Sequence, residues 1–402
     1  MQNRKIKKGD CHYFLVFVGM VLFLPSFSNT VQISQDNEVA APDYWKAPLG
    51  PTQSRSLPRS VPSLLSKSCK GCHSAIFSEW SGSRHASAWT DTIFQSALAL
   101  TGNPPVCLNC HTPLENQQAT VSAGPEGGDS TKSVDERLTK YDVELQKEGV
   151  NCSACHIRNG KIHGPYTDSR AAHPMEGSAL IKSAEFCFPC HSIPAPAGSG
   201  LARPLLDTPV EWKSSGYAQE GKTCQSCHMP REERIVGLGG PSRISFAHTW
   251  QPGRDLESLK SAISACMNCE GPGPDGTVHV FVSITNSGAG HNFPTSPYAF
   301  LEVIFSASDS EGKEIARKTE TLARVLKREG LSIKGELSDT TLKPKETRTL
   351  VFEFALAAKA DVTVRSELRY HYVDGDTFAM LKIPREVASR PWVTLLNLSQ
   401  KL

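Results

Sequence analysis

The last third of the chain alternates between hydrophobic and polar residues. The segments VHVFVSI, YAFLEVIFSAS, TRTLVFEFAL and DVTVRSELRYHYV alternate or run apolar, and the turn-forming sequences DSEGKE and KPKE punctuate them. Because successive side chains of a strand point to opposite faces, a repeat of two residues predicts strands with one face toward a core. Residues 275–402 are therefore predicted to form an all-β antiparallel sandwich domain.

Residues 63–274 lack this repeat and show short helical patterns between loops. In the segment SRHASAWTDTIFQSAL, residues spaced by four share one helical face, beginning with His85. The polar stretch 119–140 predicts a surface loop or a short helix without chemistry. We therefore expect a multidomain chain, in which a mostly α-helix and loop domain precedes the β-sandwich.

The N-terminus carries a pattern typical of export. Residues 1–28 hold a basic cluster, an apolar run of 12 residues from Tyr13 to Leu24, and a final stretch of small residues. This is the pattern of a signal peptide, and its apolar run is too short to span a bilayer comfortably. We expect a periplasmic or otherwise extracytoplasmic protein, with an uncleaved membrane anchor as the alternative. Residues 29–62 are polar and rich in proline, as in a linker.

Five CxxCH motifs follow, although histidine supplies only 13 of the 402 residues. In this motif two cysteines form thioethers with a porphyrin, and the adjacent histidine binds its iron. Zinc ribbons do not need a histidine after each pair, and disulfides do not depend on the residue after a cysteine. The sequence therefore predicts five covalently bound haem c groups, attached at Cys69/Cys72/His73, Cys107/Cys110/His111, Cys152/Cys155/His156, Cys187/Cys190/His191 and Cys224/Cys227/His228.

The composition shows how such a domain would be filled. Aromatic residues make up only 7% of the chain, so few large side chains are available to cover each porphyrin. We expect the haems to pack on one another, to form much of the interior, and to lie close enough to exchange electrons. The net charge of +2, without a basic run interleaved with aromatics, excludes a nucleic-acid partner. Haem propionates would make the holoprotein acidic, which favours a basic patch on a redox partner.

The remaining histidines supply candidates for the second axial ligand of each iron. His279 and His371 fall on the polar faces of predicted strands, so we expect them to be solvated. That leaves five candidates for five irons. A core position is the alternative for the first candidate, and ordinary turns are the alternative for those in Gly/Pro loops. The candidate distal ligands are His85, His163, His173, His248 and His291.

Several stretches together resemble the multihaem c-type cytochromes related to cytochrome c-554 and c-prime. They are CKGCHSAIFSEWSGSRHASA, EGVNCSACH, KIHGP, EGKTCQSCHMP, FAHTW and, in the predicted β-domain, GAGHNFPT, and they cover roughly residues 65–305. The resemblance implies that His85, His163, His248 and His291 are distal haem ligands, and it is weaker for His173. This family includes both electron carriers and enzymes of respiratory nitrogen, sulfur and metal metabolism, so it does not decide the activity.

A sixth cysteine pair departs from the motif. Cys266 and Cys269 in CMNCE are followed by Glu270, and a carboxylate is a poor substitute for imidazole on low-spin iron. Apolar residues from Leu256 onward recur at helical spacing, which predicts that the pair lies on a helix end at the domain junction. We expect a local disulfide there, with a sixth haem or a metal clip as alternatives.

The sequence thus predicts an exported pentahaem c-type cytochrome that transfers electrons through mainly bis-histidine haems of low potential. No catalytic residue is predicted. The expected partners are redox proteins, including membrane-associated quinol-linked or outer-surface cytochromes. One alternative is a multihaem oxidoreductase with one open-site haem acting on a small nitrogen or sulfur compound, although no CxxCK site is present. Another is a scaffold role for the β-domain in a redox assembly.

Overall fold

The structure is a computed structural model of the chain. It describes residues 57–58, 60–101, 105–126, 129–137, 141–166, 173–250, 255–330, 332–356, 361–383 and 392–402. All of them belong to one compact unit, residues 41–402. The predicted signal peptide and most of the predicted linker lie outside the described residues. No described helix is both long and apolar enough to cross a membrane.

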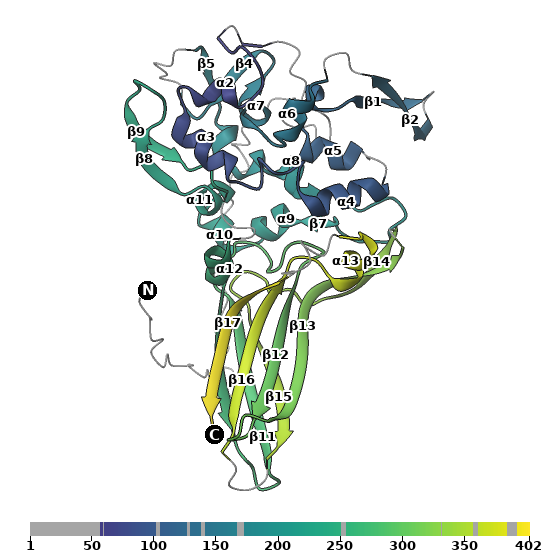
Figure 1. Cartoon of the computed structure of the whole chain (residues 1–402), viewed down its shortest axis with the longest axis vertical. Helices are drawn as coiled ribbons and strands as arrows, with labels where there is room; N and C mark the ends of the chain where they lie inside the picture. The colour runs from purple at the N-terminus through teal and green to yellow at the C-terminus, as the bar shows by residue number, and fades with distance from the viewer. Residues whose placement is uncertain are drawn as a thin grey trace, which may run out of the picture. The chain divides into compact units, whose positions relative to one another are not determined.

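Short helices carry the attachment motifs (Figure 1). The helices up to residue 262 are α2 (Lys67–Lys70), α3 (Ser74–Ser81), α4 (Thr92–Thr101), α5 (Pro105–His111), η1 (Glu115–Gln117), α6 (Val143–Lys147), α7 (Cys152–His156), η2 (Leu180–Lys182), η3 (Ala184–Phe186), α8 (Phe188–His191), α9 (Thr208–Lys213), α10 (Gly216–Gln219), α11 (Cys224–His228) and α12 (Leu256–Ala262). Helices α5, α7, α8 and α11 each end at the histidine of a CxxCH motif, and the first motif runs from α2 to the start of α3. Residues three and four positions apart share a helical face, so each motif gathers its three reactive side chains.

Small strands connect these helices, which the sequence pattern did not predict. They are β1 (Thr120–Glu126), β2 (Asp129–Arg137), β3 (Ile157–Arg158), β4 (Lys161–Gly164), β5 (Met175–Gly177), β6 (Ser192–Ile193), β7 (Leu206–Asp207), β8 (Arg231–Ile235) and β9 (Ser242–Phe246). The stretch 119–140, expected as a loop or short helix, contains the antiparallel pair β1 and β2. Its β-branched residues and the Gly-Gly at 127–128 favour a hairpin over a helix.

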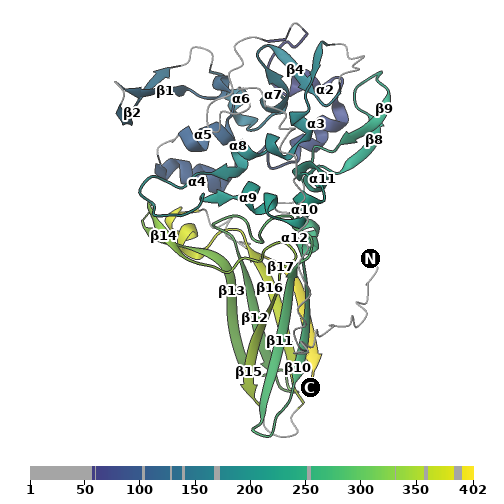
Figure 2. The same ribbon diagram turned by 180° about the vertical axis from the view of Figure 1, so that it is seen from behind.

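Within its described residues, the C-terminal part consists of two antiparallel sheets and one helix, α13 (Gly375–Met380), which confirms the predicted antiparallel strands (Figure 2). A three-stranded sheet has the order β10 (Ile263–Glu270), β11 (Thr277–Asn286), β15 (Thr347–Ala355). A five-stranded sheet has the order β14 (Ser332–Asp339), β13 (Glu314–Glu329), β12 (Phe300–Ser308), β16 (Thr363–His371), β17 (Trp392–Lys401). Burial alternates along β11, as a period of two requires.

Buried residues of both sheets form a single hydrophobic core. Val280 and Ile284 of β11 belong to it together with Leu301 and Phe305 of β12 and Leu368 of β16. Among the described residues before Leu256, the buried hydrophobic cluster is confined to Leu64, Leu114, Leu145, Ala154 and Ile157. The apolar core of the protein chain therefore lies in the sheets, and side chains alone fill much less of the helix-and-loop part.

The sixth cysteine pair lies on strand β10 and not on a helix end, so that prediction is wrong. Helix α12 ends at Ala262, and β10 pairs with β11 from Ile263 onward, because the ladder of backbone hydrogen bonds overrides the helical spacing. The expected local disulfide is also wrong, since Cys266 is in a disulfide whereas Cys269 is a free thiol. Residues three positions apart in a strand are about 10 Å apart, too far for a disulfide between them.

We expect the substitution Leu301→Ala to lower the free energy of unfolding by about 2–5 kcal/mol, because Leu301 is fully buried between the sheets. Val351 of β15 is 40% exposed, so Val351→Ala should cost less than about 1 kcal/mol. Urea unfolding of the holoprotein, followed by far-ultraviolet circular dichroism, measures both values. Equal losses of unfolding free energy for the two variants would contradict the burial of Leu301 in the core that both sheets share.

Burial raises the pKa of Cys269 to about 11, which makes its thiolate scarce at neutral pH. At pH 8 we expect the native holoprotein to be alkylated at Cys269 about 100-fold more slowly than an unperturbed thiol. The rate should rise as the pH approaches 11, and unfolding in urea should remove the difference. Peptide mass spectrometry identifies the modified residue, and fast native labelling at pH 8 would contradict the burial.

Candidate functional site

Four attachment histidines each face a second histidine across the same gap. If each metal–nitrogen bond is about 2.0 Å long and the bonded nitrogen lies about 1.1 Å from the ring centre, two imidazoles on one iron have centroids about 6.2 Å apart. The observed centroid distances are 6.2 Å for His73–His173, 6.3 Å for His85–His191, 6.1 Å for His156–His248 and 6.3 Å for His228–His291. Each gap therefore has the width that an axially coordinated iron requires.

Backbone carbonyls orient several of these rings. Nδ1 of His73 donates a hydrogen bond to the carbonyl of Val236, and Nδ1 of His111 donates to that of Ala88, at 2.8 and 2.6 Å. The same bond joins His156 to His163, His248 to Phe246 and His291 to Asn292. A carbonyl only accepts, so Nδ1 carries the proton and Nε2 is left to bind a metal.

The buried histidines are held in the neutral form that binds metals. Burial lowers the pKa of His85 to about 3 and that of His248 to about 4. Burial also lowers the pKa of His156, His191 and His291. Metal ions bind the deprotonated imidazole, so none of these side chains has to lose a proton before it coordinates iron at neutral pH.

The local backbone holds His85 in place. The N–H of Val150 donates to the carbonyl of His85 at 3.0 Å. Gly149 before it has a φ of +57°, and a Cβ there would lie 2.8 Å from the same carbonyl oxygen. This position therefore requires glycine. The segments SRHA and EGVNCSACH thus contact each other directly, which brings His85 toward the buried interior.

The second attachment site differs from the other four. The structure describes every histidine from His73 onward, and within that set no imidazole lies across from His111 at the 6 Å spacing. Phe94 stacks face to face on His111, with centroids 3.6 Å apart and planes 1° apart. Among the described residues, His111 is therefore the attachment histidine that no second histidine faces.

His163 does not face an attachment histidine in the ring pairs described above. It lies on β4, its side chain is buried, and its carbonyl accepts the hydrogen bond from Nδ1 of His156. His173, for which the resemblance was weaker, is the histidine that faces His73. His279 and His371 lie on strands, where they contact Glu353 and Glu302.

Thiols of neighbouring sites contact one another. All cysteines of the five motifs are free thiols, as thioether formation requires. The thiol of Cys69 lies close enough to that of Cys152 to shift its pKa, and the same holds for Cys110 with Cys190 and for Cys187 with Cys224. The thiols of Cys155 and Cys190 also lie within electrostatic range of each other. Site one is thus adjacent to site three, and site four is adjacent to sites two, three and five.

The second cysteine of the motif is exposed at three of the five sites. The exposed cysteines are Cys72, Cys190 and Cys227. Cys227 departs most clearly from a buried position, because it lies on the five-residue helix α11 within electrostatic range of the exposed Lys222. Such a short helix, in a part of the chain with few large apolar side chains, leaves this sulfur uncovered by protein. A thioether requires only that a porphyrin vinyl group reaches the sulfur, so the exposure of Cys227 is compatible with attachment.

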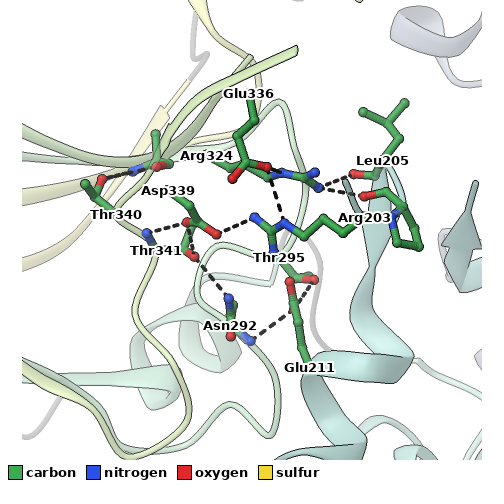
Figure 3. A network of polar contacts seen from close by, with 12 residues as sticks. Arg203, Leu205, Glu211, Asn292, Thr295, Arg324, Glu336, Asp339, Thr340 and Thr341 are labelled. Carbon is green, nitrogen blue, oxygen red and sulfur yellow. Dashed lines mark hydrogen bonds and ion pairs between the residues drawn. The ribbon is translucent and has the colours of Figure 1, made fainter. Parts of the chain in front are cut away.

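A polar network connects the helix-and-loop part to the sheets (Figure 3). The guanidinium of Arg324 on β13 donates to the carbonyls of Pro204 and Leu205, at 2.9 and 2.8 Å. Arg203 forms ion pairs with Glu336 and with Asp339. The backbone N–H of Asn292, next to His291, donates to Glu211 of α9, so the loop that carries His291 is bonded to the helix-and-loop part.

Comparison with known proteins agrees with this site. Residues 68–157, which include the first three motifs, match the family model of cytochrome c554 and c-prime. The chain is similar to a penta-heme cytochrome c552 from Thermochromatium tepidum, with a TM-score of 0.63 and 21% sequence identity over 83% of this chain and 97% of that chain. A putative beta-galactosidase from Bacteroides fragilis matches 37% of this chain and 16% of its own at 12% identity, and its TM-score of 0.18 is too low to inform the fold. No curated protein matches the sequence.

The attachment motifs, the free thiols and the neutral, buried histidines all fit covalently bound haem c. The chain shares its fold with a solved penta-heme c-type cytochrome. It resembles the cytochrome c554 and c-prime family over residues 68–157, a range that ends well before the GHNFPT loop.

The ligand of site one can be tested by two substitutions in the holoprotein. We expect His173→Ala to convert one low-spin haem to high spin, because it removes the imidazole that faces His73. His163→Ala keeps the backbone carbonyl that orients His156, so it should leave the number of low-spin haems unchanged. Electron paramagnetic resonance of the oxidised proteins counts both species. The reverse result would assign the ligand role to His163.

Proposed function

We propose that the chain is an exported pentahaem c-type cytochrome that transfers electrons between redox partner proteins. The observation that carries this proposal is the set of four histidine pairs with iron-spanning separations, in sites whose cysteines contact one another. A haem at each site would supply a reversible one-electron iron couple. Methionine is absent from the four pairs, and bis-histidine ligation favours low reduction potentials.

The thiol contacts give the sites an order that differs from their order in the sequence. Sites one, three and four follow one another, and sites two and five both adjoin site four. Helices α5 and α8, which carry sites two and four, also pack together. We infer a branched path in which site four exchanges electrons with three neighbours.

The proposed covalent haem attachment also implies export and an acidic holoprotein. Covalent haem attachment and the signal-like pattern of residues 1–28 support a periplasmic or other extracytoplasmic location. Two propionates on each haem would add negative charge to a chain of formal charge +2. The expected partners are redox proteins with basic surfaces, including membrane-associated quinol-linked or outer-surface cytochromes.

A second function is favoured by the geometry of site two. Without a histidine facing His111, the coordination position opposite this residue would be open to a small nitrogen or sulfur compound. The contact between Cys110 and Cys190 joins this site to site four, from which electrons would be delivered. The chain would then be a multihaem oxidoreductase in which the other four sites deliver electrons to site two.

The two functions make different predictions for electron paramagnetic resonance. We expect the oxidised holoprotein to show four low-spin haems and one high-spin haem, because four sites have facing histidines and site two does not. Cyanide should remove the high-spin signal with a stoichiometry of one per chain. A spectrum with five low-spin haems that cyanide does not change would eliminate the oxidoreductase.

Paired variants identify the site that gives the high-spin signal. The double substitution Cys107→Ala/Cys110→Ala should abolish attachment at site two, and with it the high-spin signal. The matched variant Cys224→Ala/Cys227→Ala should instead lose one low-spin haem. Intact mass of each holoprotein measures how many haems remain attached, and a high-spin signal that survives in the first variant would place the open position elsewhere.

A further inference from the structure

We propose that Glu211 is a positioning residue, which holds His291 across from His228 at site five. The inference rests on the proposed bis-histidine ligation of that site. Glu211 lies on α9, in the helix-and-loop part, whereas His291 lies between β11 and β12. Glu211 is outside the attachment motifs, and its carboxylate contacts the loop that carries the ligand.

The contacts of Glu211 lie on the C-terminal side of His291, on the next residue and three residues further on (Figure 3). Its Oε2 accepts a hydrogen bond from the backbone N–H of Asn292 at 3.1 Å. The same oxygen accepts a second one from the hydroxyl of Thr295 at 2.7 Å. One carboxylate of the helix-and-loop part thus fixes the backbone directly after His291 and the side chain at the end of the GHNFPT loop.

Burial makes these two hydrogen bonds important. The side chain of Glu211 is half-buried, and desolvation raises the pKa of its carboxyl, while the bonds to Thr295 and Asn292 act to lower it. A carboxylate makes stronger hydrogen bonds than a neutral acceptor. Removal of the carboxylate would leave the Asn292 N–H without an acceptor in a desolvated place, which is costly.

Contacts within the sheet region fix the shape of the loop but not its distance from His228. The side-chain amide of Asn286 donates to the carbonyl of His291 at 2.9 Å, and that of Asn292 donates to the Thr341 hydroxyl at 3.2 Å. Both partners belong to the sheet region. A contact from the other part of the chain is needed to set the gap across which iron is bound, and Glu211 supplies it next to the ligand.

Other contacts hold the two parts together independently of Glu211. The bonds from Arg324 to the carbonyls of Pro204 and Leu205 remain when Glu211 is replaced. The ion pair between Lys345 and Glu220, at 3.0 Å, also crosses from the sheets to the helix-and-loop part. The effect of losing Glu211 should therefore be local to the loop and to the fifth site.

The test compares three variants of the full holoprotein. We expect Glu211→Ala to weaken coordination by His291 about 10-fold to 100-fold, the loss typical when a partner that orients a metal ligand is removed. One low-spin haem should become high-spin or accessible to cyanide. Glu211→Gln should restore the low-spin state, because its amide oxygen can accept both hydrogen bonds. The control Glu220→Ala removes a contact between the same two parts without touching the loop, so it should leave the spectrum unchanged.

The variant His291→Ala separates this inference from the proposed ligation. If His291→Ala leaves the number of low-spin haems unchanged, the proposed ligation of site five is wrong. If His291→Ala removes one low-spin haem while Glu211→Ala retains it with unchanged cyanide binding, Glu211 has no positioning role. An equal effect of Glu211→Ala and Glu220→Ala would also overturn the inference.

A milder variant decides the question if Glu211→Ala does not accumulate as holoprotein. Thr295→Val removes the hydrogen bond that Thr295 donates to Glu211 at 2.7 Å and the one that it accepts from Thr208 at 2.8 Å, and it leaves the bond from Asn292 in place. We then expect a smaller increase, severalfold, in the rate of cyanide binding at one low-spin haem. An unchanged rate would refute the role of Glu211.

Discussion

The width of the gap between two imidazoles is the constraint on which the rest of the structure depends. An iron atom holds both axial nitrogens at fixed bond lengths, so a pair of ligands has to be placed to within a few tenths of an ångström. The chain meets this condition with segments that are distant in sequence, as for His85 with His191 and for His156 with His248. An iron bound by such a pair would close a long loop and would restrain the unfolded chain in the way that a disulfide does.

This constraint explains why the two parts of the chain have such different interiors. The sheets bury a continuous apolar core, whereas the helix-and-loop part has a small cluster around Leu114 and Leu145. Its short helices serve mainly to present cysteines and histidines. Backbone approaches are correspondingly tight at the motifs: a Cβ on Gly237 would lie 3.1 Å from Cε1 of His73, and the N–H of Leu238 donates to the carbonyl of Cys72. The β8–β9 hairpin thus lies directly against the first attachment site.

The sequence predicts those parts of the fold that depend on residues close to one another in the chain. The alternation from Thr277 onward gives β11, and the candidate ligands His85, His248 and His291 each lie opposite an attachment histidine. Sequence spacing does not show which loops meet in space, so it could not show that His173 is the histidine that faces His73. Strand β10 was missed because pairing with β11 decides its conformation. The polar-face positions of His279 and His371 exclude these two residues as ligands. His163 remains among the five candidates, so their number still equals the number of sites, and the sequence does not indicate that the second site lacks a facing histidine.

The central position of site four has a consequence for tolerance to damage. Sites one, three, four and five form a continuous series, and site two joins it as a side branch through Cys110 and Cys190. A reaction or oxidative damage at site two would leave electron transfer between sites one and five uninterrupted. If every site holds a haem, loss of the haem at site four would separate the other four into isolated groups. Natural sequence variation is therefore expected at site two before it is expected at site four.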